Sequence, residues 1–423
     1  MDADHNRVGA PAAAAAAAGA VQAVSRAEIE GAVADGNGVL FARPALVGRP
    51  SYVGRNLLAK NSEFSAETTD ERGYVTVEWW IMSKTQCLND VQRDGEGLTE
   101  LVLGDRCVRF ADAVDAAEDI LLGKYGADWP LTKVLDIGGA AVGPSFAPDE
   151  VERPPIPAHV HAGDVVCGKC TGNGKLEAYF FPPVDVPPYE MDLSGSVHTR
   201  LGIAAGVSAG QVIKCLKCGF GVDDSLYSLL ARYPIVPRTN WTIPTHVIHA
   251  PGPWPTFEIQ LPQDDYNLMA WKLGSPIEDD TERAATKSAH QLRGIANEEE
   301  LFAQTIKWER NVDPEFEAKW FRDCAAKPLE EGEWGRRLRL FHHHFYGEGF
   351  EVNPGQRYER PPSDQPFAGI VWSGRGTLNG SDLNVEILEE REFLVVPGHA
   401  ATFENSGDTV LLVYTAWPIV SRE

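Results

Sequence analysis

The sequence predicts a mainly β protein built from two β-barrels with an additional helical layer. Between residues 129 and 275, short runs of apolar and β-branched residues alternate with proline and glycine turns, a pattern typical of the short strands of a barrel or sandwich. The same pattern returns from residue 338 to 423, in runs such as "FAGIVWSGRGTLNG" and "TVLLVYTAW". The segment between them, 276–337, is charge-rich with helical spacing, so we expect a helical linker or layer there.

Composition excludes several classes of function. The chain has 423 residues, with 38 Lys and Arg against 61 Asp and Glu, a formal net charge of −23 that repels nucleic acid and anionic membrane surfaces. No run approaches the roughly 18 consecutive apolar residues that a membrane span requires. Seven cysteines form an odd number in a long chain, which favours a reducing compartment over a disulfide framework. We therefore expect a cytoplasmic protein that binds neither nucleic acid nor membrane.

The region before the first barrel divides into two parts. Residues 1–40 open with an acidic start and an alanine-rich run, which predicts a disordered or loosely helical tail rather than an export signal. Residues 41–128 contain the β-rich run "GYVTVEWWIMS" and the helical pattern "RFADAVDAAEDILLGKYG", in which apolar residues recur on one face. We expect these strands and this helix to pack on the first barrel.

The first barrel, 129–275, contains one predicted helix and a candidate metal site. In "SAGQVIKCLKCGFG", Ser208 and Gln211 have capping-box spacing, and Gly219 is the stop. His159 and His161 are one residue apart, which on a strand places both side chains on the same face, and His249 closes another strand. Glu177 has apolar and aromatic strand neighbours, where an unpaired carboxylate is costly. Three imidazoles and one carboxylate suit a divalent metal with open positions.

The order of these motifs resembles the cupin superfamily and, within it, the type I phosphomannose isomerases. "LLGKYGADWPLTKVLDIGG" is similar to the family's entry into the barrel, "HVHAGD" to its second motif, "GKLE" (Gly174 to Glu177) to its third, and His249 with Ala250 to its last. The resemblance spans about Asp119 to Gly274 and implies jelly-roll barrels and a metal ion held by His159, His161, Glu177 and His249. His159 stands where the family has glutamine, and "EIQLPQDDYNLMAWK" lacks the family's late arginine, which leaves open whether the sugar carries a phosphate.

The function predicted is metal-dependent aldose–ketose isomerisation of a sugar or sugar phosphate, with zinc the first choice of metal and manganese or iron the alternatives. This reaction needs a Lewis acid and a base that moves a proton between adjacent carbons. Candidates for the base are His246, Asp264 and Asp265. Lys175 has the spacing to share the face of Glu177 and stabilise a developing oxyanion. Two rivals stay open: an Fe(II)- and O₂-using cupin dioxygenase, and a carbohydrate-binding cupin without turnover.

Two further features carry weaker expectations. Cys167 with Cys170 and Cys215 with Cys218 have the spacing of a four-cysteine structural zinc site, although buried thiols or a disulfide explain them as well. In 338–423, Arg357, Tyr358 and Glu359 stand where a cupin would carry its histidine pair, and Ala401 where it would carry its late histidine. We therefore expect a degenerate, metal-free cupin barrel that supports the fold or a homodimer contact.

Overall fold

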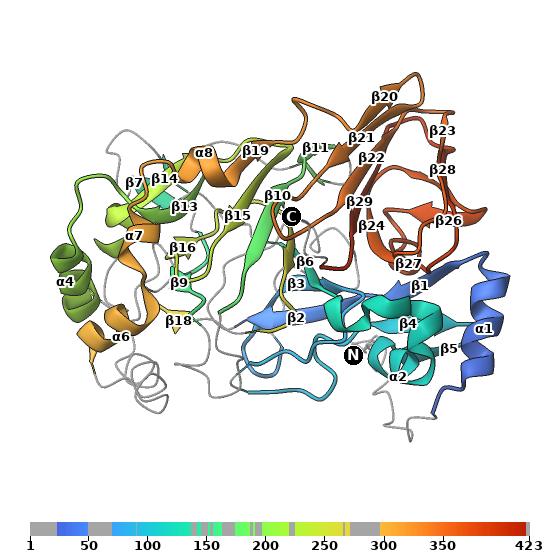
Figure 1. Ribbon diagram of the computed structural model, residues 1–423, viewed down its shortest axis with the longest axis horizontal. Coiled ribbons are helices and arrows are strands. Elements are labelled where there is room, and N and C mark those ends of the chain that lie inside the picture. The colour runs from blue at the N-terminus through green and yellow to red at the C-terminus, as the bar shows by residue number, and fades with distance from the viewer. Residues whose placement is uncertain are drawn as a thin grey trace, which may run out of the picture.

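Two β-barrels lie side by side, and each is built from a large sheet facing a small one (Figure 1). The structure is a computed structural model that describes residues 23–49, 70–89, 91–136, 142–144, 151–152, 155–162, 174–186, 189–190, 197–219, 225–264, 267–270 and 297–419. The prediction of a mainly β, two-barrel cupin fold is confirmed.

In the first barrel, a seven-stranded sheet faces a five-stranded sheet. The strand order is β2-β3-β6-β17-β10-β15-β19 in the large sheet and β14-β13-β16-β9-β18 in the small sheet. The large sheet contains β2 (Ala45–Arg49), β3 (Val75–Ile81), β6 (Leu131–Leu135), β10 (Glu177–Phe181), β15 (Thr239–Ile243), β17 (Thr256–Gln260) and β19 (Phe321–Asp323). The small sheet contains β9 (His159–Val160), β13 (His198–Ile203), β14 (Leu230–Pro234), β16 (His249–Ala250) and β18 (Asn267–Leu268). Two short hairpins, β7 (Val142–Pro144) with β8 (Val151–Glu152) and β11 (Asp185–Val186) with β12 (Tyr189–Glu190), lie outside both sheets.

In the second barrel, a nine-stranded sheet faces a four-stranded sheet. The strand order is β20-β21-β22-β29-β24-β27-β1-β4-β5 in the large sheet and β23-β28-β25-β26 in the small sheet. The large sheet contains β1 (Val39–Arg43), β4 (Glu100–Leu103), β5 (Arg106–Arg109), β20 (Glu330–Gly332), β21 (Gly335–Arg339), β22 (Glu348–Val352), β24 (Phe367–Ser373), β27 (Glu392–Val395) and β29 (Leu411–Ala416). The small sheet contains β23 (Arg357–Arg360), β25 (Arg375–Leu378), β26 (Ser381–Asn384) and β28 (Ala401–Asn405).

The two barrels repeat one topology. The order β2-β3-β6-β17-β10-β15-β19 in the first barrel corresponds strand for strand, and in nearly the same chain order, to β20-β21-β22-β29-β24-β27-β1 in the second. The small sheets correspond likewise, so β9 matches β23 and β16 matches β28, while β10 matches β24 in the large sheets. Residues at these matched strands can therefore be compared directly.

The large sheets pack against each other through their outer faces. Phe180 on β10 contacts Tyr414 on β29, with ring centroids 5.1 Å apart, and Phe257 on β17 stacks on Phe341 at 5.6 Å. Side chains alternate along a strand, so Glu177, Tyr179 and their cross-strand partners point the other way, into the first barrel. The apolar half of each strand thus joins the barrels, and the polar half is left for the barrel interior.

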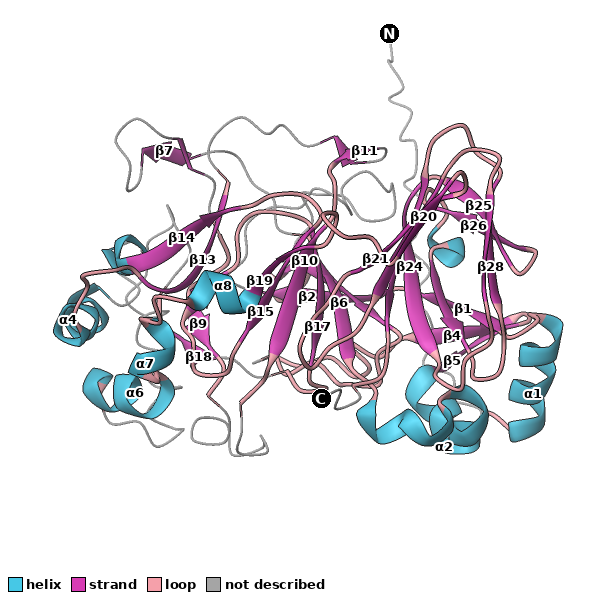
Figure 2. Ribbon diagram, turned by 45° about the horizontal axis from the view of Figure 1, so that its top comes forward, coloured by secondary structure: helices cyan, strands magenta, loops and turns pink. Residues whose placement is uncertain are grey.

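Helices cover the ends of the molecule (Figure 2). The second barrel is flanked by α1 (Arg26–Asp35) and α2 (Phe110–Leu121), and the first by α4 (Ala209–Gly219), α6 (Glu298–Thr305), α7 (Trp308–Asn311) and α8 (Phe316–Trp320). The helix predicted at residues 109–126 is confirmed as α2, and the capping box before α4 is present, with Gln211 N donating to Ser208 Oγ at 3.4 Å and Ser208 N donating to Gln211 Oε1 at 2.9 Å. Among the described residues, no helix is both long enough and apolar enough to cross a membrane.

The N-terminal region differs from expectation in two ways. Within the predicted tail, 1–40, a capped helix is present, because Ser25 forms a capping box with Glu28 at the start of α1. The boundary at residue 40 is wrong, because β1 begins at Val39. The segment 41–128 does not pack on the first barrel alone: β2 and β3 join its large sheet, but β1 pairs with β27, and β4 and β5 extend the second barrel. Within the expected helical layer, 276–337, β19 and β20 add strands to the helices.

Candidate metal centre and active site

Three histidines converge from two neighbouring strands of the small sheet. His159 on β9 lies directly opposite His249 on β16, with ring centroids 4.2 Å apart, and His161 follows on the same face of the chain as His159. One nitrogen from each ring lies within 4.8 Å of the others, and all three side chains are buried. The intervening Val160 and the neighbouring Ala250 point the other way, into the apolar cluster beneath α4 and α6. Strand alternation thus directs the imidazoles into the barrel and the aliphatic side chains toward the helices.

Backbone carbonyls set the tautomer of two of these rings. Nδ1 of His159 lies 2.7 Å from the carbonyl oxygen of Pro157, and Nδ1 of His249 lies 2.8 Å from that of Val247. A proton on each Nδ1 satisfies these contacts and places the lone pair of each ring on Nε2, the arrangement that metal-binding histidines use. Burial lowers the pKa of His159 well below its usual value, and burial together with Lys175 lowers that of His161 to about 3. The rings of His159 and His161 are therefore neutral at physiological pH, the form that binds a metal.

Glu177 approaches the histidines from the opposite sheet. It opens β10, and its carboxylate oxygens lie 3.1 Å from Nε2 of His161 and 3.0 Å from Nε2 of His249. Burial alone would raise the pKa of Glu177, but the adjacent Lys175 ammonium, at 3.1 Å, together with the rings of His161 and His249 outweighs burial and holds that pKa well below its usual range. The result is a buried carboxylate anion against three imidazoles, a donor set that fits a divalent cation.

Lys175 is fixed beside this carboxylate by its own surroundings. Its Nζ donates to Oε1 of Gln260 at 2.8 Å and lies 3.1 Å from Glu177 and 3.9 Å from Glu258. The preceding Gly174 has φ of +70°, and a Cβ there would lie 2.6 Å from the carbonyl oxygen of His161. Only glycine allows this close approach, which holds the Lys175 loop against the histidine strand.

Sequence reasoning missed Glu258, which the structure places next to Lys175. It lies on β17 opposite Tyr179, is 3 % exposed, and its Oε1 receives no hydrogen bond from the described residues. Burial, followed by the negative charge of Glu177, raises its pKa to about 8. The signal was present in "TFEIQL", where an acidic residue interrupts an apolar strand just as Glu177 does in "LEAYFF".

Asp264, predicted as a candidate base, instead belongs to a separate buried ion cluster. Arg49 donates to Asp264 at 2.9 Å and to Glu78 at 2.7 Å, and Lys133 lies 3.6 Å and 3.4 Å from these two carboxylates. Burial would raise the pKa of Asp264, but Arg49 and Lys133, with a hydrogen bond from the Leu88 amide, together outweigh burial and keep that pKa well below its usual value. The carboxylate of Asp264 thus serves as an ion-pair partner of Arg49. Arg49 lies on β2, far earlier in the chain. Asp265 lies outside the described residues.

His246, the other predicted base, is turned toward the helices. Its φ is +66°, its Nδ1 lies 3.0 Å from the carbonyl oxygen of Thr305 on α6, and its own carbonyl accepts from Asn311 at 2.8 Å. The ring therefore anchors α6 to the turn before β16. The described contacts of the ring are made with α6, and the role of His246 as the base stays a prediction.

The predicted four-cysteine zinc site falls largely outside the described residues. Cys167 and Cys170 lie outside them, as does the side chain of Cys218, while Cys215 is a partly buried free thiol on α4. The proposal of a structural zinc at these cysteines is neither supported nor contradicted by the described part of the chain.

Comparison with solved structures places the fold. A protein from Archaeoglobus fulgidus, proposed to be a mannosephosphate isomerase, superposes with a TM-score of 0.58 at 14 % identity, over 90 % of this chain and 98 % of its own. The mannose 6-phosphate isomerase of Bacillus subtilis superposes with a TM-score of 0.55 at 16 % identity, over 89 % of this chain and 99 % of its own. The chain has the fold of the phosphomannose isomerases. No family model and no curated protein sequence matches it.

Proposed function

We propose that this protein is a metal-dependent aldose–ketose isomerase that acts on a sugar or sugar phosphate. The observation that carries the proposal is the buried convergence of His159, His161 and His249 with the ionised Glu177, a donor set for one divalent cation. The fold shared with mannosephosphate isomerases supports the same reaction class, and zinc is the first metal to test.

The residues around this donor set divide the chemistry between them. A bound metal would polarise the carbonyl and hydroxyl oxygens of an open-chain sugar. Lys175, fixed by Gln260 and Glu177, supplies a positive charge where negative charge develops on a sugar oxygen. Glu258, a buried carboxyl 3.9 Å from Lys175, would in its ionised form take the proton from one carbon and return it to the next, and its raised pKa of about 8 makes that form a strong base. Burial of all these groups excludes water, which strengthens each interaction.

The decisive experiment follows the transferred proton. Protein loaded with zinc or manganese is incubated in D₂O with aldose and ketose pairs, both free and phosphorylated, beginning with mannose 6-phosphate and fructose 6-phosphate. We expect deuterium at C2 of the aldose and conversion between partners, both detected by NMR. Absence of exchange and conversion for every pair, in metal-replete protein, would overturn the proposal. Substrate-dependent oxygen uptake with Fe(II) would indicate the dioxygenase chemistry that the same donor set also suits.

A further inference from the structure

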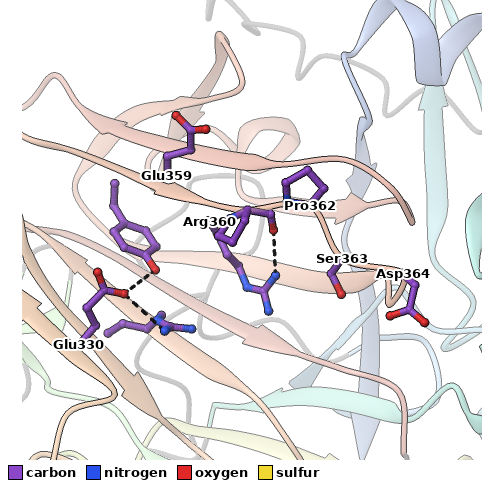
Figure 3. Close-up of a pocket in the computed structure, with 9 residues that line it drawn as sticks. Glu330, Glu359, Arg360, Pro362, Ser363 and Asp364 are labelled. Carbon is purple, nitrogen blue, oxygen red and sulfur yellow. Dashed lines mark hydrogen bonds and ion pairs between the residues drawn. The ribbon is translucent and has the colours of Figure 1, made fainter.

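A hollow of about 590 Å³ opens at the end of the second barrel (Figure 3). It is lined by Glu330, by Arg337 and by the continuous segment from Tyr358 to Asp364. This volume lies within the range of about 300–1,000 Å³ that small-molecule sites occupy. The hollow belongs to the barrel without the histidine set, so it is separate from the candidate metal centre.

The hollow lies at the strand that matches the histidine strand of the first barrel. β23 corresponds to β9, and its residues alternate in the same way: Arg357 and Glu359 are exposed, while Tyr358 is buried and Arg360 is partly buried. Arg360 lies over the ring of Phe367, which opens β24, the strand matched to β10, which Glu177 opens. The barrel mouth that carries metal ligands in one half of the molecule thus carries a guanidinium and a phenol in the other.

Every charge that lines the hollow already has a partner. Glu348, fully buried, binds Arg337 and Arg360 at 3.0 Å each, and Glu330 lies 3.4 Å from Arg337. At the rim, Glu359 pairs with Arg357 at 3.1 Å and Asp364 with Lys124 at 3.2 Å. Counted together with these partners, four positive and four negative groups give the hollow little net attraction for an ion of either sign.

The paired groups still have both hydrogen-bond donors and hydrogen-bond acceptors available to a ligand. Arg360 uses Nε on Glu348 and Nη1 on the carbonyl oxygen of Pro361. No described residue accepts a hydrogen bond from its Nη2 group, and in Figure 3 the guanidinium points into the hollow. Carboxylate oxygens of Glu330 and Glu359 accept. Pro361 and Pro362, both exposed, add rigid apolar rings whose conformation need not be ordered on binding.

We propose that this hollow binds a neutral saccharide of one or two units, at a site distinct from the metal centre. A sugar hydroxyl donates and accepts at once, which matches a wall of fixed guanidinium donors and carboxylate acceptors, and the C–H face of a sugar ring packs on the proline rings. Because Arg337 and Arg360 are held by the buried Glu348, the site is preorganised in the absence of ligand. The inference does not depend on the chemistry of the first barrel.

The test is hydrogen–deuterium exchange of the full-length protein with and without mannose, glucose, maltose and cellobiose as probes. At least one of these sugars is expected to slow exchange in the peptides that contain residues 357–364, with a dissociation constant of about 1 mM or tighter, as is ordinary for a ligand of this size. Filling the hollow with Ser363→Trp should weaken this effect at least tenfold, whereas Ser381→Trp, at a partly buried serine on β26 outside the hollow, should leave it unchanged.

A second variant keeps the test decisive if Ser363→Trp fails to fold. Arg360→Lys retains the positive charge beside Glu348 but removes the planar fork, so the sugar effect should weaken about tenfold while the folded protein persists. Failure of all four sugars to protect residues 357–364, or protection that neither variant weakens, would overturn the proposal. Stronger protection by inorganic phosphate or acetate than by any sugar would also overturn it, because it would identify an anion site.

Discussion

The two barrels share a strand order but differ in what fills them. Inside the first, the large sheet presents Glu177, Glu258, Lys133 and Glu78 toward the strands that carry the histidines. The second is filled by aromatic and aliphatic side chains such as Phe350, Phe393 and Phe403, with Glu348 and its two arginines confined to one end. Buried charges are costly unless each has a partner. The difference teaches that one topology tolerates either an apolar core or an ionic interior, and that only the ionic interior provides a donor set for metal chemistry.

The largest expected effect follows from removing the negative charge of the metal centre. Glu177→Gln leaves three imidazoles and no anion to balance a divalent cation, and it also removes the carboxylate partner of Lys175. We expect loss of bound metal after dialysis, measured by elemental analysis, and loss of sugar isomerisation. The matched control is Glu392→Gln, another fully buried carboxylate, which lies between the barrels and should keep wild-type metal content. A metal-replete, active Glu177→Gln protein would mean that function does not lie in the first barrel's histidine site.

The second prediction separates the two ionic groups inside the first barrel. Lys175→Met removes the charge beside the proposed reaction, so kcat should fall roughly 10² to 10³-fold while metal remains bound near neutral pH. Without Lys175 the pKa of Glu177 rises, so metal should be lost at a higher pH than in the wild type when the solution is acidified. Lys133→Met, in the cluster with Glu78 and Asp264, should instead lower stability. The measurements are kinetics, metal content and denaturant unfolding on both variants. Similar results for Lys175→Met and Lys133→Met would contradict the division into a reactive and a structural ionic group.

The third prediction concerns the charged end of the second barrel. Glu348→Ala leaves Arg337 and Arg360 partly buried without their shared carboxylate, which should lower the free energy of unfolding by about 3–5 kcal/mol. Metal content per folded protein should stay unchanged, because this end is not part of the metal centre. Denaturant titration with parallel elemental analysis tests both statements. An unchanged unfolding midpoint, or loss of metal from folded protein, would show that the barrels are not divided in this way.

How much of this arrangement the sequence predicts depends on the range of the interactions. The positions of His159, His161 and Glu177 follow from alternation within single strands, and the structure brings them together with His249. Alternation applied with equal care would also have found Glu258. Asp264 forms an ion pair with Arg49, and β1 pairs with β27. No local sequence pattern predicts which distant segment a charged side chain or a strand edge will contact. Prediction therefore succeeded where strand period alone decides a side chain's direction and failed where long-range pairing decides its neighbour.

The smallest effect is a pH dependence that originates between the barrels. Glu392 on β27 accepts hydrogen bonds from Trp79 Nε1 at 2.5 Å and from the Met82 amide at 2.7 Å, which joins the second barrel to β3 of the first. Burial raises its pKa from 4.5 to about 8, an effect that these hydrogen bonds only partly offset. Between these two values the unfolded chain releases the proton while the folded protein keeps it. The free energy of unfolding should therefore fall as pH rises through this window, by up to about 1.4 kcal/mol per pH unit, and level off above it.

Glu392→Gln, which mimics the protonated side chain, should remove this contribution, whereas Glu359→Gln, at an exposed carboxylate of the same barrel, should not. Denaturant unfolding across the window measures the slopes, and equal slopes for wild type and Glu392→Gln would show that this carboxylate is ionised in the folded protein.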